Sequence, residues 1–152
     1  MAKVQTFSEL QPYVGSELGV ADWLTIDQPM IDQFGAVTRD QHWIHVDPER
    51  AKAEGGFGGT LAHGFLTLSL LTGMLKECME VTGAKRWMNY GLDGVRFTNP
   101  VKAGQSVRLR LTLKSLEITS PGAAKLCCGC TLELQGSDRP ALVADFRMIG
   151  YE

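Results

Sequence analysis

Apolar and polar residues alternate, position by position, in three segments of the second half of the chain. A period of two is typical of a β-strand that buries one face. The apolar positions are Val107, Leu109, Leu111 and Leu113; then Leu126, Cys128, Cys130, Leu132 and Leu134; then Leu142, Ala144, Phe146 and Met148. A fourth strand is predicted around Met88 to Phe97, and turn residues separate the four at Asn99-Pro100, Ser120-Pro121-Gly122 and Gly136-Ser137-Asp138.

The first half of the chain has the spacing of helices. Apolar residues three and four positions apart predict an amphipathic helix from Pro29 to Thr38. A short helix is expected from Asp47-Pro48 to about Glu54, because aspartate is a favoured N-cap and proline suits the first helical turn. The longest helix is predicted from His63 to about Glu80. Apolar residues cover nearly all of its sides, as in a buried helix.

One long buried helix followed by a run of antiparallel strands is an α+β pattern. The simplest packing of these elements wraps the sheet around the central helix. Glu17 to Ile26 adds a short strand before the helices, and the glycine-rich stretch Gly55 to Gly59 is expected to be a loop. A length of 152 residues is a common size for one domain, so we expect residues 1–152 to form a single domain.

Composition excludes several classes of protein. The net charge is -2 and the basic residues form no stripe along the sequence, which argues against a nucleic-acid partner. The start lacks the pattern of a signal peptide, and the apolar stretches are too short and too polar to span a membrane, so a cytoplasmic location is expected. Four cysteines without a second C-x-x-C pair are best explained as small buried apolar residues: Cys78, Cys127, Cys128 and Cys130.

Candidate chemistry is concentrated in the irregular stretch from Asp40 to His45. A carboxylate and an imidazole on a loop between helices suit proton transfer near neutral pH. The alternative is structural: Asp40 caps a turn and His45 is a buried histidine bonded to backbone. A metal site built from His42, His45 and Asp47 is weaker, because their spacing matches no standard site.

The second candidate feature is His63-Gly64, at the predicted start of the long helix. Free N–H groups and the helix dipole at such a start favour a negatively charged oxygen. Gly64 has no side chain to block an approaching carbonyl. The structural alternative is a plain helix start with a hydrogen-bonded histidine.

Taken together, these segments resemble the MaoC-like dehydratases, also called type 2 or (R)-specific enoyl-CoA hydratases. The resemblance rests on Asp40 to His45 with Asp47-Pro48, followed by Ala62-His63-Gly64-Phe65-Leu66. The stretches Trp43 to Ala51 and Asn89 to Phe97 are closer still to the NodN-like branch. The likeness covers nearly the whole chain.

The resemblance implies a hot-dog fold, a homodimer, and hydration of an enoyl thioester of coenzyme A or acyl carrier protein. It implies that Asp40 and His45 are the catalytic pair and that the N–H of Gly64, beside His63, holds the thioester oxygen. Thr72 falls where some members have a serine lining the site. No metal or redox cofactor is implied, and the product is the (R)-3-hydroxyacyl thioester.

The chain also departs from the family pattern. His42 and Trp43 replace the usual asparagine and proline, and Arg39 stands where glycine commonly precedes the aspartate. These changes leave the pair intact and concern its hydrogen-bonded surroundings. Two other functions remain open at this point: a hot-dog acyl-CoA thioesterase, and a protein that binds acyl thioesters without turning them over.

Overall fold

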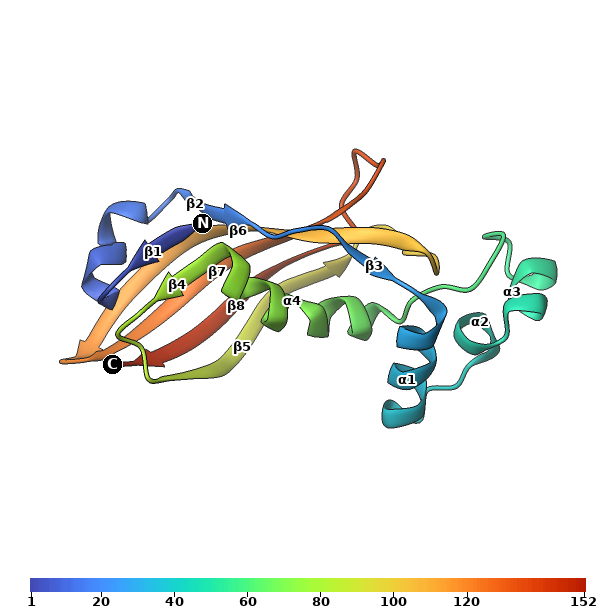
Figure 1. Cartoon of the computed structure of the whole chain (residues 1–152), viewed down its shortest axis with the longest axis horizontal. Coiled ribbons are helices and arrows are strands. Elements are labelled where there is room, and N and C mark those ends of the chain that lie inside the picture. Colours follow the sequence, from blue (N-terminus) through green and yellow to red (C-terminus); the bar gives the residue numbers. More distant parts are fainter.

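The computed structural model describes all 152 residues. It consists of a curved antiparallel sheet, a long helix across its concave face, a small two-stranded sheet, and a group of short helices beyond the N-terminal end of the long helix (Figure 1). The helical elements are η1 (Phe7–Tyr13), α1 (Gln28–Thr38), α2 (Trp43–Val46), α3 (Pro48–Glu54) and α4 (Gly64–Cys78). The strands are β1 (Ala2–Val4), β2 (Glu17–Val20), β3 (Leu24–Ile26), β4 (Met79–Val81), β5 (Arg86–Phe97), β6 (Gln105–Ser120), β7 (Ala123–Leu134) and β8 (Leu142–Tyr151).

The sheet has the order β2-β6-β7-β8-β5, with β3 paired to β6 beside β2. The alternation predicted for β6, β7 and β8 is confirmed. Leu109 of β6 lies opposite Leu132 of β7, and both are fully buried on the face that packs toward α4. No helix of the chain combines the length and the apolar character that crossing a bilayer requires.

The segment predicted as one strand, Glu17 to Ile26, is divided into β2 and β3. Both strands pair with β6, but the main-chain N–H of Asp22 between them donates to the side chain of Glu77 at 2.9 Å. Glu77 belongs to α4, so a distant side chain takes the hydrogen bond that a continuous strand would have made with its neighbour.

The predicted starts of α1 at Pro29 and of α3 at Asp47-Pro48 are confirmed to within one residue. Asp27 accepts the N–H of Met30 at the start of α1, and Asp47 accepts the N–H of Arg50 at the start of α3, each at 3.0 Å. The stretch expected to be irregular contains the one-turn helix α2. Periodicity does not reveal an element of four residues.

The long helix is confirmed, but it is shorter and less enclosed than predicted. It ends at Cys78 rather than about Glu80, because Met79–Val81 forms β4 and pairs in parallel with β1. Leu71 and Met74 pack toward the sheet, whereas Phe65 is 67% exposed. The prediction of a helix buried on all sides is therefore wrong for the single chain. One face of α4 stays open beside the edge strand β5, whose residues are mostly exposed.

Candidate active site

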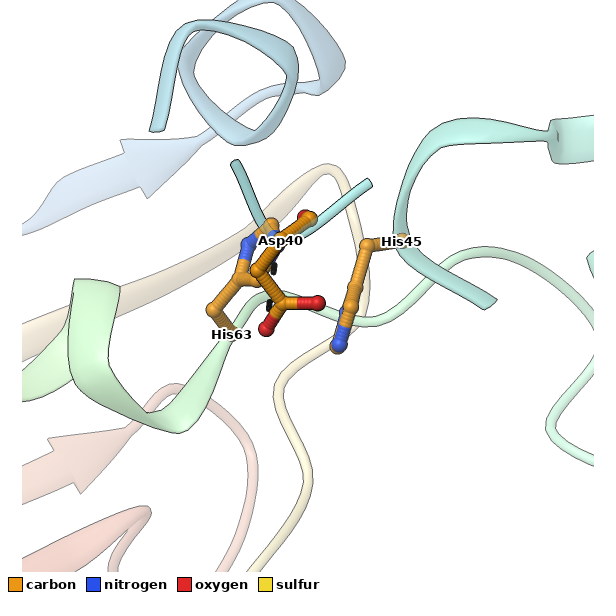
Figure 2. A group of neighbouring side chains, drawn as sticks. All are labelled: Asp40, His45 and His63. Carbon is orange, nitrogen blue, oxygen red and sulfur yellow. Dashed lines mark hydrogen bonds and ion pairs between the residues drawn. The ribbon is translucent and has the colours of Figure 1, made fainter. Parts of the chain in front are cut away.

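Three side chains from separate elements meet near the start of α4 (Figure 2). Asp40 follows α1, His45 lies in α2, and His63 immediately precedes α4. One carboxylate oxygen of Asp40 and one ring nitrogen of each histidine all lie within 4.8 Å of one another. The structure thus brings together the two residues predicted as a pair and adds His63 to them.

Asp40 is presented by a tight turn at the end of α1. Arg39 ends the helix with φ of 63°, a left-handed conformation that glycine adopts most readily. Arg39 takes this conformation although it carries a side chain. The side chain of Asp40 is 58% exposed, so its carboxylate is open to a bound molecule.

His45 is held by its main chain and its ring. Its Nδ1–H donates to the carbonyl of Leu61 at 2.7 Å, and the N–H of Leu61 donates to the carbonyl of Ile44 at 3.0 Å. The bond to Leu61 places the proton of the neutral ring on Nδ1 and leaves Nε2 with a free lone pair. Burial lowers the pKa of His45, partly offset by the hydrogen bond to Leu61. A neutral imidazole with a free lone pair is suited to act as a base.

His63 lies behind this pair rather than on the open surface of the site. Its ring is 3% exposed, and its Nε2–H donates to the main-chain carbonyl of Asp40 at 2.8 Å. The ring stacks on His45, with 3.9 Å between centroids and 25° between planes. The imidazole of His63 therefore offers no surface to a substrate. Donors for an oxyanion would come from the main-chain N–H groups at the start of α4, which follows His63.

The same three residues are a possible ligand set for a metal ion, but their geometry does not fit one. Tetrahedral metal sites require ligand lone pairs that converge on one point about 2 Å from each nitrogen. The stacked imidazoles hold their in-plane lone pairs in two nearly parallel planes, with ring centroids 3.9 Å apart, so these lone pairs do not meet at one point, and the Nε2–H of His63 is already bonded to the Asp40 carbonyl. The arrangement favours proton transfer over metal binding.

Gly64 is the first residue of α4, so its N–H has no acceptor within the helix. No other group in the protein accepts a hydrogen bond from this N–H. A Cβ atom here would lie 3.0 to 3.2 Å from ring carbons of Phe97, at the end of β5. An added Cβ would therefore require the ring of Phe97 to move by a few tenths of an ångström, so glycine lets this ring pack closely on the start of the helix. A hollow of about 340 Å³ lies beside Gly64 and Phe97, lined also by Phe57, Ala62, Thr67 and Val101.

Thr72 does not join the cluster of Asp40, His45 and His63. It lies two turns further along α4, in a second hollow of about 340 Å³ between α4 and the exposed strand β5. Gly64, Leu68 and Thr72 are spaced four residues apart, so they share one face of the helix. Gly64 lines the first hollow, and Leu68 and Thr72 line the second.

His42 has a local structural role. Its Nδ1 accepts the N–H of Ile44 at 3.3 Å and so caps α2, the helix that carries His45. Asparagine, the residue that the resemblance led us to expect here, is also a good N-cap, so His42 can fill the same structural role. A second support was not predicted: the side chain of Gln28 donates to the carbonyl of His45 at 2.8 Å. No periodicity or motif marks Gln28 for this contact.

Comparison with known proteins places these features in context. Residues 9–121 match the family described as MaoC like domain. Nodulation protein N of Rhizobium leguminosarum bv. viciae is 42% identical, over 93% of this chain and 88% of that protein. The 3-hydroxyacyl-thioester dehydratase Z of Mycobacterium tuberculosis (strain ATCC 25618 / H37Rv) is 41% identical, over 95% of both chains.

Solved structures share the fold. The monoamine oxidase regulatory protein from Archaeoglobus fulgius superimposes with a TM-score of 0.80 at 22% identity, over 100% of this chain and 98% of that chain. The (R)-hydratase from A. caviae involved in PHA biosynthesis has a TM-score of 0.67 at 22% identity, over 89% of this chain and 98% of that chain. The hot-dog arrangement expected from the sequence is confirmed.

Proposed function

Because this chain belongs to the MaoC-like family, we propose that it is an (R)-specific enoyl-thioester hydratase, acting in reverse as a 3-hydroxyacyl-thioester dehydratase. The observation that carries the proposal is the pair itself. The carboxylate of Asp40 and the free lone pair of the His45 ring face one space at the start of α4. The name of the mycobacterial relative, a 3-hydroxyacyl-thioester dehydratase, supports the same chemistry.

The spacing of the pair suits one water molecule. Polar atoms within 4.8 Å of each other allow a single water to hydrogen-bond to both. In hydration, His45 Nε2 accepts a proton from this water while its oxygen bonds to C3 of the enoyl group. The electrons of the double bond move to the thioester oxygen, and the proton then returns through the pair to C2. Each positioned acid or base contributes about 10²–10⁴-fold to such a reaction.

The developing negative charge on the thioester oxygen needs a donor. The N–H of Gly64 is free, and it lies at the positive end of the dipole of α4. One donor of this kind is worth about 3–4 kcal/mol. With the thioester held at Gly64, the acyl chain follows the open face of α4 past Leu68 into the hollow at Thr72.

The open face of α4 and the edge strand β5 support a symmetric homodimer. β5 pairs only with β8, and its outer edge leaves main-chain groups unpaired. Tyr90 on β5 and Phe65 on α4 are 62% and 67% exposed. A second copy adding its own β5 would extend the sheet and cover both. Light scattering tests this at micromolar concentration, where a monomer would contradict the proposal.

A spectrophotometric assay tests the proposed reaction. Purified protein is mixed with crotonyl-CoA and with longer enoyl-CoAs, and loss of the conjugated enoyl absorbance is followed. A thiol-release assay on the same samples detects a thioesterase. Asp40 and His45 lie close together, so they would act from one side of an enoyl group whose thioester oxygen is held at Gly64, and water and proton are expected to add to the same face. Product oxidised only by an (S)-specific 3-hydroxyacyl-CoA dehydrogenase contradicts the assignment.

We also propose a cytoplasmic location. All four cysteines are free and buried, as expected in a reducing compartment.

A further inference from the structure

His63 has the only buried side-chain nitrogen or oxygen atom in the protein that lacks a hydrogen-bond partner. That atom is Nδ1; the opposite nitrogen, Nε2, is bonded to the carbonyl of Asp40. A buried polar side chain with half of its hydrogen-bonding capacity unused costs stability, so its place calls for a reason other than stability. The reason lies in what the rest of the ring touches.

The ring of His63 contacts both members of the proposed pair, each in a different way. It holds Asp40 through the main-chain carbonyl, 23 residues away in the sequence, and its Nε2 lies 4.0 Å from a carboxylate oxygen of the same residue, whose side chain stays exposed. It supports His45 by stacking on the face of its ring, which leaves the edge bearing Nε2 open. Since His63 directly precedes Gly64, the same residue connects the pair to the proposed oxyanion donor.

The opposite side of this contact is closely packed. Gly35 on α1 comes so near that a Cβ atom there would lie 3.0 Å from the Asp40 carbonyl oxygen and 3.5 Å from Cε1 of His63. Phe34 packs on the same ring, with 5.2 Å between centroids. The ring of His63 is thus packed between residues of α1 and His45 of α2.

We propose that His63 is the positioning residue of this site, which holds Asp40 and His45 in one arrangement relative to the N–H of Gly64. The inference rests on the proposed hydratase function, and it assigns His63 no contact with the substrate. Its action is through Asp40 and His45: it fixes the main-chain position from which the Asp40 side chain extends, and it fixes the orientation of the His45 ring.

His63 also acts on the charge of His45. The ionisable groups that face His45 are Asp40 from the turn after α1, His42 at the cap of α2, and His63 before α4. Burial is the main cause of the lowered pKa of His45, and the positive charge of a protonated His63 or His42 would lower it further, whereas Asp40 raises it. Removing the ring of His63 is therefore expected to raise the pKa of His45.

Two substitutions separate the functions of the ring. His63→Gln keeps an N–H donor for the Asp40 carbonyl and removes the stacked ring. His63→Phe keeps a stacked ring and removes the donor. For both we expect kcat on crotonyl-CoA to fall by about tenfold or more with KM little changed, since misplacement of reacting groups by about 1 Å costs about 10²-fold. For both, the acid limb of the kcat/KM profile is expected to move to higher pH.

His42→Gln is the matched control. It makes the same change in an exposed histidine whose ring centroid lies 6.4 Å from that of His45, compared with 3.9 Å for His63. A smaller loss of kcat and a smaller movement of the acid limb are expected. Full kcat and an unmoved acid limb in His63→Gln overturn the inference, and that variant alone decides if His63→Phe does not fold.

NMR titration makes the outcome independent of turnover. The chain has three histidines, so the imidazole signals of His45 are assigned by comparing the wild type with single variants. A higher titration midpoint for His45 in His63→Gln supports the inference, and an unchanged midpoint overturns it. If the wild-type protein does not hydrate any enoyl-CoA, the proposed function fails, while this measurement still tests the role of His63.

Discussion

Gly35→Ala tests whether the packing around Asp40 and His63 controls activity. A Cβ atom at Gly35 would lie 3.0 Å from the Asp40 carbonyl oxygen, 3.3 Å from Cγ1 of Val46 and 3.5 Å from Cε1 of His63. The closest of these atoms belongs to the main chain and has no free rotation to move away. The Asp40 carbonyl or the helix α1 must therefore shift by a few tenths of an ångström.

The change in stability is expected to be small. Alanine in place of glycine within a helix gains about 1 kcal/mol, while overpacking a closely packed contact costs about 1–3 kcal/mol. The free energy of unfolding should fall by about 0–2 kcal/mol, which a domain with a typical stability of about 5–15 kcal/mol tolerates. The protein remains folded, and the shift acts on the position of Asp40.

The effect on catalysis is expected to be larger. Misplacement of a reacting group by about 1 Å costs about 10²-fold in rate, so a few tenths of an ångström at Asp40 should lower kcat by about tenfold. Urea denaturation measures the stability, and hydration of crotonyl-CoA measures kcat. The matched control is Gly73→Ala on α4, where an added Cβ meets nothing within 4 Å.

Gly73→Ala should gain stability from the same helix preference and retain wild-type kcat, because Gly73 is exposed and lies away from the pair. The reasoning is refuted if Gly35→Ala keeps kcat within about twofold of the wild type. Equal losses in both variants would also refute it, because only Gly35 is in close contact with the site.

Asp40→Asn and His45→Ala should each abolish most hydratase turnover with the fold intact by circular dichroism, whereas His42→Ala should cost much less; an essential His42 beside a dispensable His45 would contradict this. Because burial lowers the pKa of His45 below its ordinary value of 6.5, the acid limb of kcat/KM should have its midpoint below pH 6.5. The unfolded chain binds the proton on the His45 imidazole more readily than the folded chain does. The contribution of His45 to the free energy of unfolding is therefore present above pH 6.5 and is lost as pH falls through its pKa in the folded protein. Urea titrations at a series of pH values measure this loss. Thr72→Phe should fill the hollow between α4 and β5, so activity on octenoyl-CoA should fall by about tenfold or more while crotonyl-CoA is still hydrated, and an unchanged chain-length profile would place the acyl chain elsewhere.

Local sequence determined much of this molecule. The alternation in β6, β7 and β8 was sufficient to assign both the strands and their buried faces, because a period of two is the pattern of a strand that buries one face. Asp47 marked a helix start through a hydrogen bond that spans three residues. The pair of Asp40 and His45 was also visible, since the two lie five positions apart and one turn brings them together.

Tertiary structure decided the features that depend on distant contacts. The bond from His63 to the Asp40 carbonyl joins residues 23 positions apart, and the bond that sets the tautomer of His45 reaches Leu61, 16 positions away. The packing of Phe97 on Gly64 and the parallel pairing of β1 with β4 also join residues that are far apart in the sequence. A periodic pattern reports which face of an element is buried but not what covers it. The sequence therefore identified the candidate groups for the proposed reaction, whereas the tautomer, orientation and support of those groups followed only from the packing of the helices around them.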